Sequence, residues 1–231
     1  MIRGVFFDAG NTIVFPDYTI YRKIVASLGA DVALSDVLRA EALARSAFDS
    51  AVASSPGRDV AGFWSVYYTP FYEHLGIPRE LIPAAIESTR DANGEGLGIW
   101  SVPVDGFAET MDELDARGLV VGIISNSDGR LDGRLVEIGI RDRFDFVLDS
   151  AVVGISKPSP RIFEMAVEAS GLAPPETAYV GDYYEVDVVG ARGAGMTPVL
   201  FDPYGAYGDV DCDVIRRFGD IVRLVDVWRG Q

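Results

Sequence analysis

The chain has 231 residues, 48% of them hydrophobic and 24% charged, which is typical of a globular protein and not of a disordered one. Thirty-five acidic residues against twenty basic ones give a formal net charge of −15, which repels nucleic-acid phosphates and anionic membrane surfaces. Cys212 is the single cysteine, which excludes an internal disulfide and argues against a cysteine-based zinc site. No apolar run approaches the length of a bilayer span and no signal peptide is apparent, so we expect a cytoplasmic protein that binds neither nucleic acid nor membrane.

The first expected strand and the turn after it form the most informative segment. Residues 2–7 are a short apolar run that ends at Asp8, and small or turn-forming residues follow over 9–12. This pattern places Asp8 at the carboxyl end of a buried strand, where open α/β sheets bind their ligands. An Asp in this position also caps turns, so the assignment depends on the segments that follow.

The segment after this turn differs in character from the rest of the chain. Its apolar spacing predicts helices throughout, over 21–28, 36–53 with Ser35 as N-cap, 61–75 and 79–90. A glycine-rich loop over 91–101 then carries the chain back and is suited to act as a hinge. We therefore predict an all-helical cap domain, residues 16–92, inserted into a core domain made of residues 1–15 and 93–231.

From Gly118 onward, short apolar segments alternate with helical patterns. Strands are expected over 119–125, 144–149, 177–181 and 197–201. Between them, apolar residues recur at three- and four-residue spacing, as on the buried face of a helix. This alternation predicts an α/β fold: a Rossmann-like, mainly parallel sheet with helices on both faces.

Four segments, each at the end of a predicted strand or the start of a helix, carry polar side chains that would meet at one edge of such a sheet. They are Asp8 with Thr12, Ser125 with Asn126, Lys157, and Asp182 with Asp187. Lys157 is one of only two lysines in the chain. Carboxylate oxygens suit Mg2+, and a lysine with a hydroxyl and backbone N–H groups suits a phosphoryl group. The pattern indicates a site for Mg2+ and a phosphorylated ligand.

With these residues in this order, the chain resembles the haloacid dehalogenase (HAD) superfamily of hydrolases and, within it, the phosphatases. The segment from Asp8 to Thr12 is similar to the first of the family's four motifs and Ser125 to the second. Lys157 with Pro158 is similar to the third, and Gly181-Asp182 through Asp187 to the fourth. Each motif alone is weak, but four in order over the whole chain are specific. The resemblance implies a Rossmann-like core with an inserted helical cap.

The resemblance also implies roles for these residues. Asp8 would be the nucleophile that forms an aspartyl-phosphate. Asp8, the main-chain carbonyl of Gly10 and Asp182 would bind Mg2+. The phosphate would be held by Ser125, Asn126 and Lys157, with Asp187 and Thr12 in support. From the residues alone, a turn-capping Ser125, a surface Lys157 and an N-capping Asp187 remain alternatives.

The chain departs from the family pattern at one position. Family phosphatases carry a second Asp two residues after the nucleophile, as the general acid and base, and here that residue is Gly10, followed by Asn11. General acid–base assistance contributes about 100- to 10,000-fold, or roughly 3 to 5 kcal/mol of barrier. The departure therefore bears directly on which reaction is expected.

Three interpretations follow from Gly10. In the first, the protein is a Mg2+-dependent phosphatase of a small phosphorylated metabolite, with a good leaving group or an acid from the substrate or from Asp17, Tyr18 or His74. In the second, it is a phosphonatase or dehalogenase; the intact Gly181-Asp182 pair argues against a metal-free dehalogenase, and Lys23 is the lysine available to a phosphonatase. In the third, it binds phosphate or Mg2+ with little turnover. The sequence does not indicate an oligomeric state.

Overall fold

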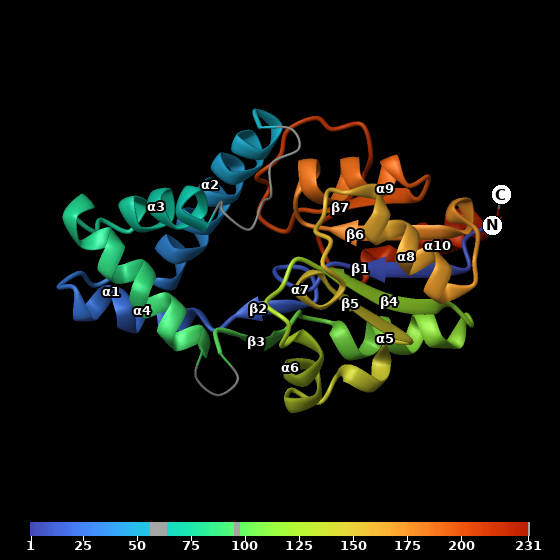
Figure 1. The fold of residues 1–231 in the computed structure, drawn as a ribbon, viewed down its shortest axis with the longest axis horizontal. Coiled ribbons are helices and arrows are strands. Elements are labelled where there is room, and N and C mark those ends of the chain that lie inside the picture. Colours follow the sequence, from blue (N-terminus) through green and yellow to red (C-terminus); the bar gives the residue numbers. More distant parts are fainter. Residues whose placement is uncertain (56–63, 95–97, 231) are drawn as a thin grey trace. The chain divides into compact units, whose positions relative to one another are not determined.

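The chain folds into two compact units, each described by itself. The computed structural model describes residues 1–55, 64–94 and 98–230. One unit, called the core unit, comprises Met1–Phe15, Pro103–Pro203 and Asp209–Gln231, and the other, the helical unit, comprises Pro16–Val102 and Tyr204–Gly208 (Figure 1). The assignment of residues 16–92 as a cap domain and of residues 1–15 and 93–231 as a catalytic core stays a prediction.

A six-stranded parallel sheet forms the centre of the core unit, in the order β5-β4-β1-β6-β7-β8. Its strands are β1 (Gly4–Phe7), β4 (Val120–Ser125), β5 (Phe146–Asp149), β6 (Thr177–Gly181), β7 (Thr197–Phe201) and β8 (Asp213–Ile215). β1 lies between β4 and β6, with Phe7 opposite Ile123 on one side and Val180 on the other (Figure 1). The predicted parallel α/β architecture is confirmed, and its strand order reverses around β1, which is where such sheets bind ligands.

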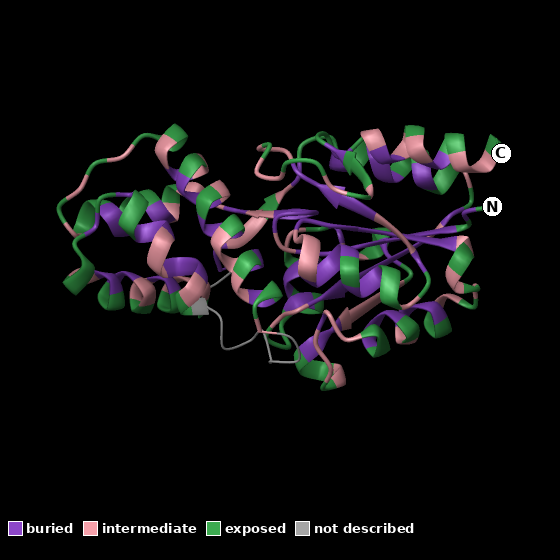
Figure 2. Ribbon diagram, turned by 90° about the horizontal axis from the view of Figure 1, so that it is seen from above, coloured by how far each residue is buried: buried purple, intermediate pink, exposed green. Residues whose placement is uncertain are grey.

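Helices cover both faces of this sheet. They are α5 (Phe107–Ala116), α6 (Leu131–Glu137), α7 (Ser150–Val153), α8 (Pro160–Ser170), α9 (Val189–Gly193) and α10 (Asp220–Gly230). Neighbouring residues of a strand point to opposite faces. Phe6 therefore packs in one apolar cluster with Phe163 of α8 and Ala191 of α9, whereas the ring of Phe7 lies 5.2 Å from that of Phe218. In Figure 2 the central strands of the sheet are buried and the helices alternate between buried and exposed residues.

The observed strand bounds agree closely with the predicted ones where the sequence contains a clear apolar run. β6 and β7 have the predicted bounds, while β1, β4 and β5 begin one or two residues later than expected. β8 and α10 were not predicted. β8 has only three residues, two of them exposed, and so short a strand carries no alternation to detect.

The helical unit contains α1 (Tyr18–Ser27), α2 (Leu34–Ala53), α3 (Trp64–His74) and α4 (Ile82–Gly94), which follows a 3-10 turn at Arg79–Leu81. Its centre is an aromatic cluster in which the rings of Tyr21 and Phe71 lie 5.0 Å apart. The hydroxyls of Tyr21 and Tyr68 are hydrogen-bonded at 3.2 Å. The aromatic residues of α3 thus stabilise the helical unit itself.

Two local predictions for this unit need correction. Ser35 is not an N-cap, because α2 begins at Leu34 with Ala33 at the cap, where the Asp36 carboxylate accepts a hydrogen bond from the Ala33 backbone N–H at 3.0 Å. The expected loop over 91–101 begins late, since α4 continues to Gly94 and β3 (Trp100–Pro103) pairs with β2 (Val14–Pro16). The first residues of the helix expected at 61–75 and part of this loop lie outside the described residues. No helix in the described ranges is long and apolar enough to cross a bilayer.

Candidate active site

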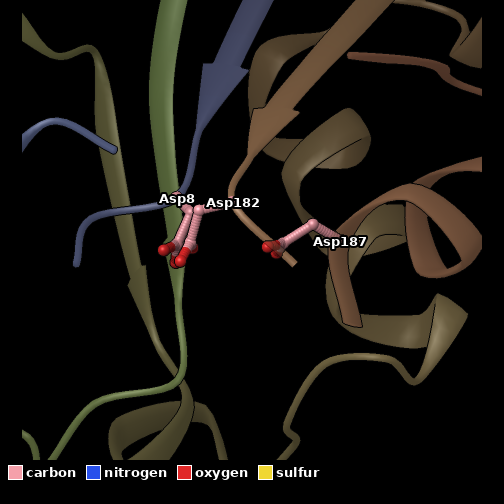
Figure 3. A group of neighbouring side chains, drawn as sticks. All are labelled: Asp8, Asp182 and Asp187. Atoms are coloured by element: carbon pink, nitrogen blue, oxygen red, sulfur yellow. The ribbon is translucent and has the colours of Figure 1, made fainter. Parts of the chain in front are cut away.

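Three buried carboxylates meet at the carboxyl edge of the central strands. Asp8 follows β1, and its backbone N–H donates to the Val180 carbonyl of β6 at 2.8 Å, so Asp8 lies beside the end of the strand that precedes Asp182. Asp187 comes from the π-helical segment Tyr184–Val188 directly beyond. Oxygen atoms of the three carboxylates lie within 4.8 Å of one another. Figure 3 shows Asp8 and Asp182 side by side and Asp187 pointing toward them.

The Gly181-Asp182 pair has a steric basis. A Cβ atom at residue 181 would overlap the carboxyl group of Asp187, so only glycine leaves room for that side chain. Asp187 Oδ2 accepts a hydrogen bond from the Tyr183 backbone N–H at 2.9 Å. The glycine, the tight turn and the placement of Asp187 are therefore one local structure.

Lys157 supplies the cation of this cluster and is only 2% exposed. Its Nζ atom donates to Asp8 Oδ1 at 2.5 Å, to Asp187 Oδ1 at 2.8 Å and to the Tyr179 hydroxyl at 2.8 Å. Burial opposes its charge, yet the carboxylates of Asp187 and Asp8 hold the pKa of Lys157 above its ordinary value. The structure brings the predicted Asp8, Lys157 and Asp187 into direct contact, and a surface position for Lys157 is wrong.

The balance of charge in the cluster leaves room for a cation. Three aspartates and one lysine carry a formal charge of −2 when all are ionised. Burial raises the pKa of Asp8, the ammonium of Lys157 opposes that rise, and the carboxylate of Asp187 adds to it. Hard oxygen ligands in this number and spacing fit Mg2+, and a divalent cation would neutralise the remaining charge.

The side chain of Asn126 is hydrogen-bonded to the backbone of Lys157. Its Oδ1 accepts from the Lys157 backbone N–H at 2.8 Å, and its Nδ2 donates to the Lys157 carbonyl at 2.9 Å. The amide thus fixes the backbone of Lys157 across the sheet edge. A phosphate contact from this residue would have to come from its main-chain N–H. Ser125, beside it, ends β4 and is buried.

The turn after Asp8 is strained and holds two buried polar atoms. Asn11 has a φ of 56°, which makes it the single non-glycine residue with positive φ among those that the structure describes. Asn11 Oδ1 and Thr12 Oγ1 are both buried and have no hydrogen-bond partner within the described part of the chain. The predicted supporting role of Thr12 stays a prediction, as does the metal-binding role of the Gly10 carbonyl.

Asn11→Gly is expected to raise the free energy of unfolding by at least about 1 kcal/mol. Relief of the left-handed strain and removal of a buried unpaired oxygen, each worth about 1–3 kcal/mol, outweigh the roughly 0.5–1 kcal/mol of chain entropy that glycine costs. Urea denaturation measures the change, with Asn11→Ala as the control that keeps the strain. An unchanged or lower stability of the glycine variant would show that the Asn11 amide has a stabilising partner.

The three residues considered as substitute acids all belong to the helical unit, where each has a structural contact. The Asp17 carboxylate caps α1 by accepting from the Thr19 backbone N–H at 2.9 Å. The Tyr18 hydroxyl pairs with that of Tyr204 at 3.1 Å, and His74 Nδ1 lies 2.7 Å from the Pro70 carbonyl. The core unit therefore does not itself place any of these three beside Asp8.

One site residue was missed from the sequence. Tyr179, on β6, is 1% exposed and its hydroxyl contacts Lys157 Nζ. Burial and the carboxylates of Asp187 and Asp8 hold the pKa of Tyr179 well above its ordinary value, so the hydroxyl is neutral. The available signal was a tyrosine in an otherwise apolar buried strand, since a buried hydroxyl needs a partner.

Comparisons with known proteins agree with this arrangement. A family model described as haloacid dehalogenase-like hydrolase matches residues 2–195. Haloacid dehalogenase-like hydrolase domain-containing protein 3 of Homo sapiens is 45% identical over 101 residues, which are 44% of this chain and 40% of that protein. The match thus spans less than half of the human protein's length.

A second relative covers more of the chain, and a solved structure covers almost all of it. The phosphoserine phosphatase of Thermus thermophilus is 34% identical over 195 residues, which are 79% of this chain and 74% of that enzyme. The putative HAD-hydrolase YfnB of Bacillus subtilis, solved bound to magnesium, is similar with a TM-score of 0.71 at 15% identity, over 97% of this chain and 99% of that one. At this identity the likeness concerns the fold.

Proposed function

This chain belongs to the haloacid dehalogenase-like hydrolases, and on that premise we propose that it is a Mg2+-dependent phosphatase of a small phosphorylated metabolite. The observation that carries the proposal is the buried cluster of Asp8, Asp182 and Asp187 with the ammonium of Lys157 in contact with two of them. This donor set suits a divalent cation and a phosphoryl group together. The relative named as a phosphoserine phosphatase supports the same reaction class.

In the proposed reaction Asp8 provides the nucleophile. One carboxylate oxygen of Asp8 attacks phosphorus, the phosphorus–oxygen ester bond breaks, and the leaving group takes the electron pair. Water then attacks the phosphorus of the aspartyl-phosphate, which releases inorganic phosphate and restores Asp8, and the proton that the water gives up balances the one that the leaving group takes from solvent. The other Asp8 oxygen stays in contact with Lys157, whose fixed charge keeps the carboxylate oriented for attack.

The remaining residues hold charge in place. Lys157 and the Ser125 hydroxyl would bind phosphate oxygens as negative charge develops on them. Asp8, Asp182 and the Gly10 carbonyl would hold Mg2+, with Asp187 orienting Lys157 through their 2.8 Å contact. When bound, the metal would neutralise charge on the phosphoryl group and on Asp8.

A substrate panel with purified protein tests the proposal. Aryl phosphates, alkyl phosphates such as phosphoserine, and acyl phosphates are assayed with and without Mg2+. We expect hydrolysis of at least one class, loss of that activity with EDTA, and at least a 1,000-fold loss in Asp8→Asn, on the order found when a covalent nucleophile is removed. Asp36→Asn, which alters the cap of α2 instead, is the matched control. A flat panel with Mg2+ and with other divalent metals would rule the phosphatase out.

Gly10 favours a second candidate, in which the same nucleophile cleaves a carbon–halogen or carbon–phosphorus bond. Neither bond calls for the missing acid in the way that an ester oxygen does. The assays are 2-haloacids and phosphonoacetaldehyde. Activity that survives EDTA would favour the dehalogenase, and loss of activity in Lys23→Met would favour the phosphonatase.

A further inference from the structure

Tyr179 lies beneath the carboxylate cluster, on the strand that leads into Asp182. We infer that Tyr179 is a positioning residue, whose hydroxyl holds the ammonium of Lys157 where it reaches Asp8 and Asp187 together. The expected kinetic effects rest on the proposed function. The contacts between Tyr179 and Lys157 are independent of it. None of the four motifs includes this residue.

The donor count of Lys157 gives the first argument. An ammonium group has three N–H donors. The contacts of Nζ are three acceptors at hydrogen-bonding distance: Asp8 Oδ1 at 2.5 Å, Asp187 Oδ1 at 2.8 Å and the Tyr179 hydroxyl at 2.8 Å. Two of these acceptors are charged and pull the ammonium toward themselves. The third is neutral and fixes the direction of the remaining N–H, so the position of Nζ is defined by three contacts instead of two.

The hydroxyl of Tyr179 is itself fixed. Its O–H faces the Ile124 carbonyl of β4 at 2.9 Å, closer than Asp187 Oδ1 at 3.3 Å, and donation to Ile124 leaves its lone pairs for Lys157. Its ring packs edge-on against Phe163 with centroids 4.9 Å apart. The side chain therefore has little freedom to move. Because Ile124 directly precedes Ser125, the same hydroxyl also links the strand end that carries Ser125 to the one that leads into Asp182.

A neutral acceptor suits this position on electrostatic grounds. The cluster already contains three carboxylates and one ammonium. A further carboxylate would add negative charge and compete with Asp8 for Lys157, whereas a hydroxyl orients the ammonium without adding charge. The tyrosine thus leaves the attraction between Lys157 and Asp8 intact.

The competing explanation is that Tyr179 only packs the core. Tyr179→Phe separates the two, because it keeps the ring against Phe163 and removes the oxygen. A packing role predicts that any effect of the substitution is independent of Lys157. A positioning role predicts that the effect vanishes when Lys157 is no longer present, since coupled residues are not additive.

The experiment is a double-mutant cycle of Tyr179→Phe and Lys157→Met with Mg2+ present. We expect Tyr179→Phe to lower kcat about 10-fold, with a smaller change in KM, as for loss of a hydrogen bond to a charged group. In the Lys157→Met background the same substitution should change neither value. Tyr184→Phe is the matched control: it removes a hydroxyl that contacts Asp211 at 2.5 Å and not Lys157, so kcat should stay at the wild-type value.

Binding separates failure of this inference from failure of the proposed function. Inorganic phosphate with Mg2+, titrated by calorimetry, needs no turnover. Its affinity should be lower in Tyr179→Phe than in the wild type, and should be the same in Lys157→Met and in the double variant. If no substrate of the panel is hydrolysed, the proposed phosphatase activity is ruled out, but the comparison of phosphate affinities remains valid. Equal losses in both backgrounds would overturn the inference. Should Lys157→Met not fold, a crystal structure of Tyr179→Phe decides: Nζ still in contact with both Asp8 and Asp187 would overturn it, and loss of either contact would support it.

Discussion

Gly10→Asp is expected to raise the rate of phosphate-ester hydrolysis by about 100- to 10,000-fold, the usual contribution of a general acid or base. Gly10 follows Asp8 by two residues, and the carboxylates that cluster with Asp8 within 4.8 Å in the described part of the chain are those of Asp182 and Asp187. Both of these belong to the cluster that suits a cation. An aspartate at residue 10 would be free to protonate the leaving oxygen and then to activate water.

The gain should depend on the leaving group. Aryl and acyl phosphates release oxygen anions that need little protonation, so the variant should improve them least. Alkyl phosphates, whose leaving oxygen is strongly basic, should improve most. A plot of log kcat against the pKa of the leaving group measures this, and its slope should become shallower in Gly10→Asp.

Gly10→Asn is the control for this substitution, because the asparagine side chain has the same shape as that of aspartate but cannot transfer a proton. Gly10 is not among the described glycines with positive φ, so its backbone accepts a side chain without the strain found at Asn11. Equal rates for both variants and the wild type would mean that more than the acid has been lost, or that the protein catalyses another reaction.

Lys157→Met is expected to lower the free energy of unfolding by about 3–5 kcal/mol, which is typical when one partner of a buried ion pair is removed. Asp8 and Asp187 would lose their shared cation while remaining almost fully buried. Phosphatase activity should fall along with stability, because the charge that orients Asp8 and meets the phosphate would be gone.

Added Mg2+ should restore part of this stability. The variant cluster would carry one more uncompensated negative charge, so a divalent cation should stabilise the variant more than the wild type. Urea denaturation with and without Mg2+ measures both effects. Lys23→Met is the matched control for stability, since it makes the same change at the other lysine, on the exposed side of α1, and should change stability by less than about 0.5 kcal/mol. Equal losses in the two variants would show that Lys157 does not stabilise the cluster.

The sequence predicted the sheet and the location of the site for one physical reason. Parallel strands end at the same edge, so Asp8, Ser125 and Asp182, each at the end of an apolar run, had to lie near one another. Two local features were not predicted correctly. β8 was missed because three residues are too few to show an alternating pattern. The cap of α2 was assigned to Ser35, whereas the side chain of Asp36 accepts from the backbone N–H of the cap residue Ala33.

Side-chain partners were harder to predict than positions. Nothing in the sequence indicated that the amide of Asn126 holds the backbone of Lys157, or that the hydroxyl of Tyr179 reaches β4 past the intervening strand β1. Such contacts depend on strand register and side-chain rotamers, which local patterns do not determine. Gly10 is the opposite case. The sequence shows that a carboxylate of the family pattern is absent at this position, whereas the fold itself does not reveal its absence.

The central claim is that Asp8 accepts the phosphoryl group, and trapping the intermediate tests it most directly. With Gly10 in place of a base, water should attack the aspartyl-phosphate slowly, so the intermediate should accumulate during turnover. The reaction with Mg2+ and the best substrate of the panel is quenched in acid, and the peptide that contains Asp8 is analysed by mass spectrometry. We predict a phosphoryl group on Asp8 in the wild type and none in Asp8→Asn. Release of phosphate with an unmodified Asp8 at every quench time, or with the phosphoryl group on another residue, would contradict the account.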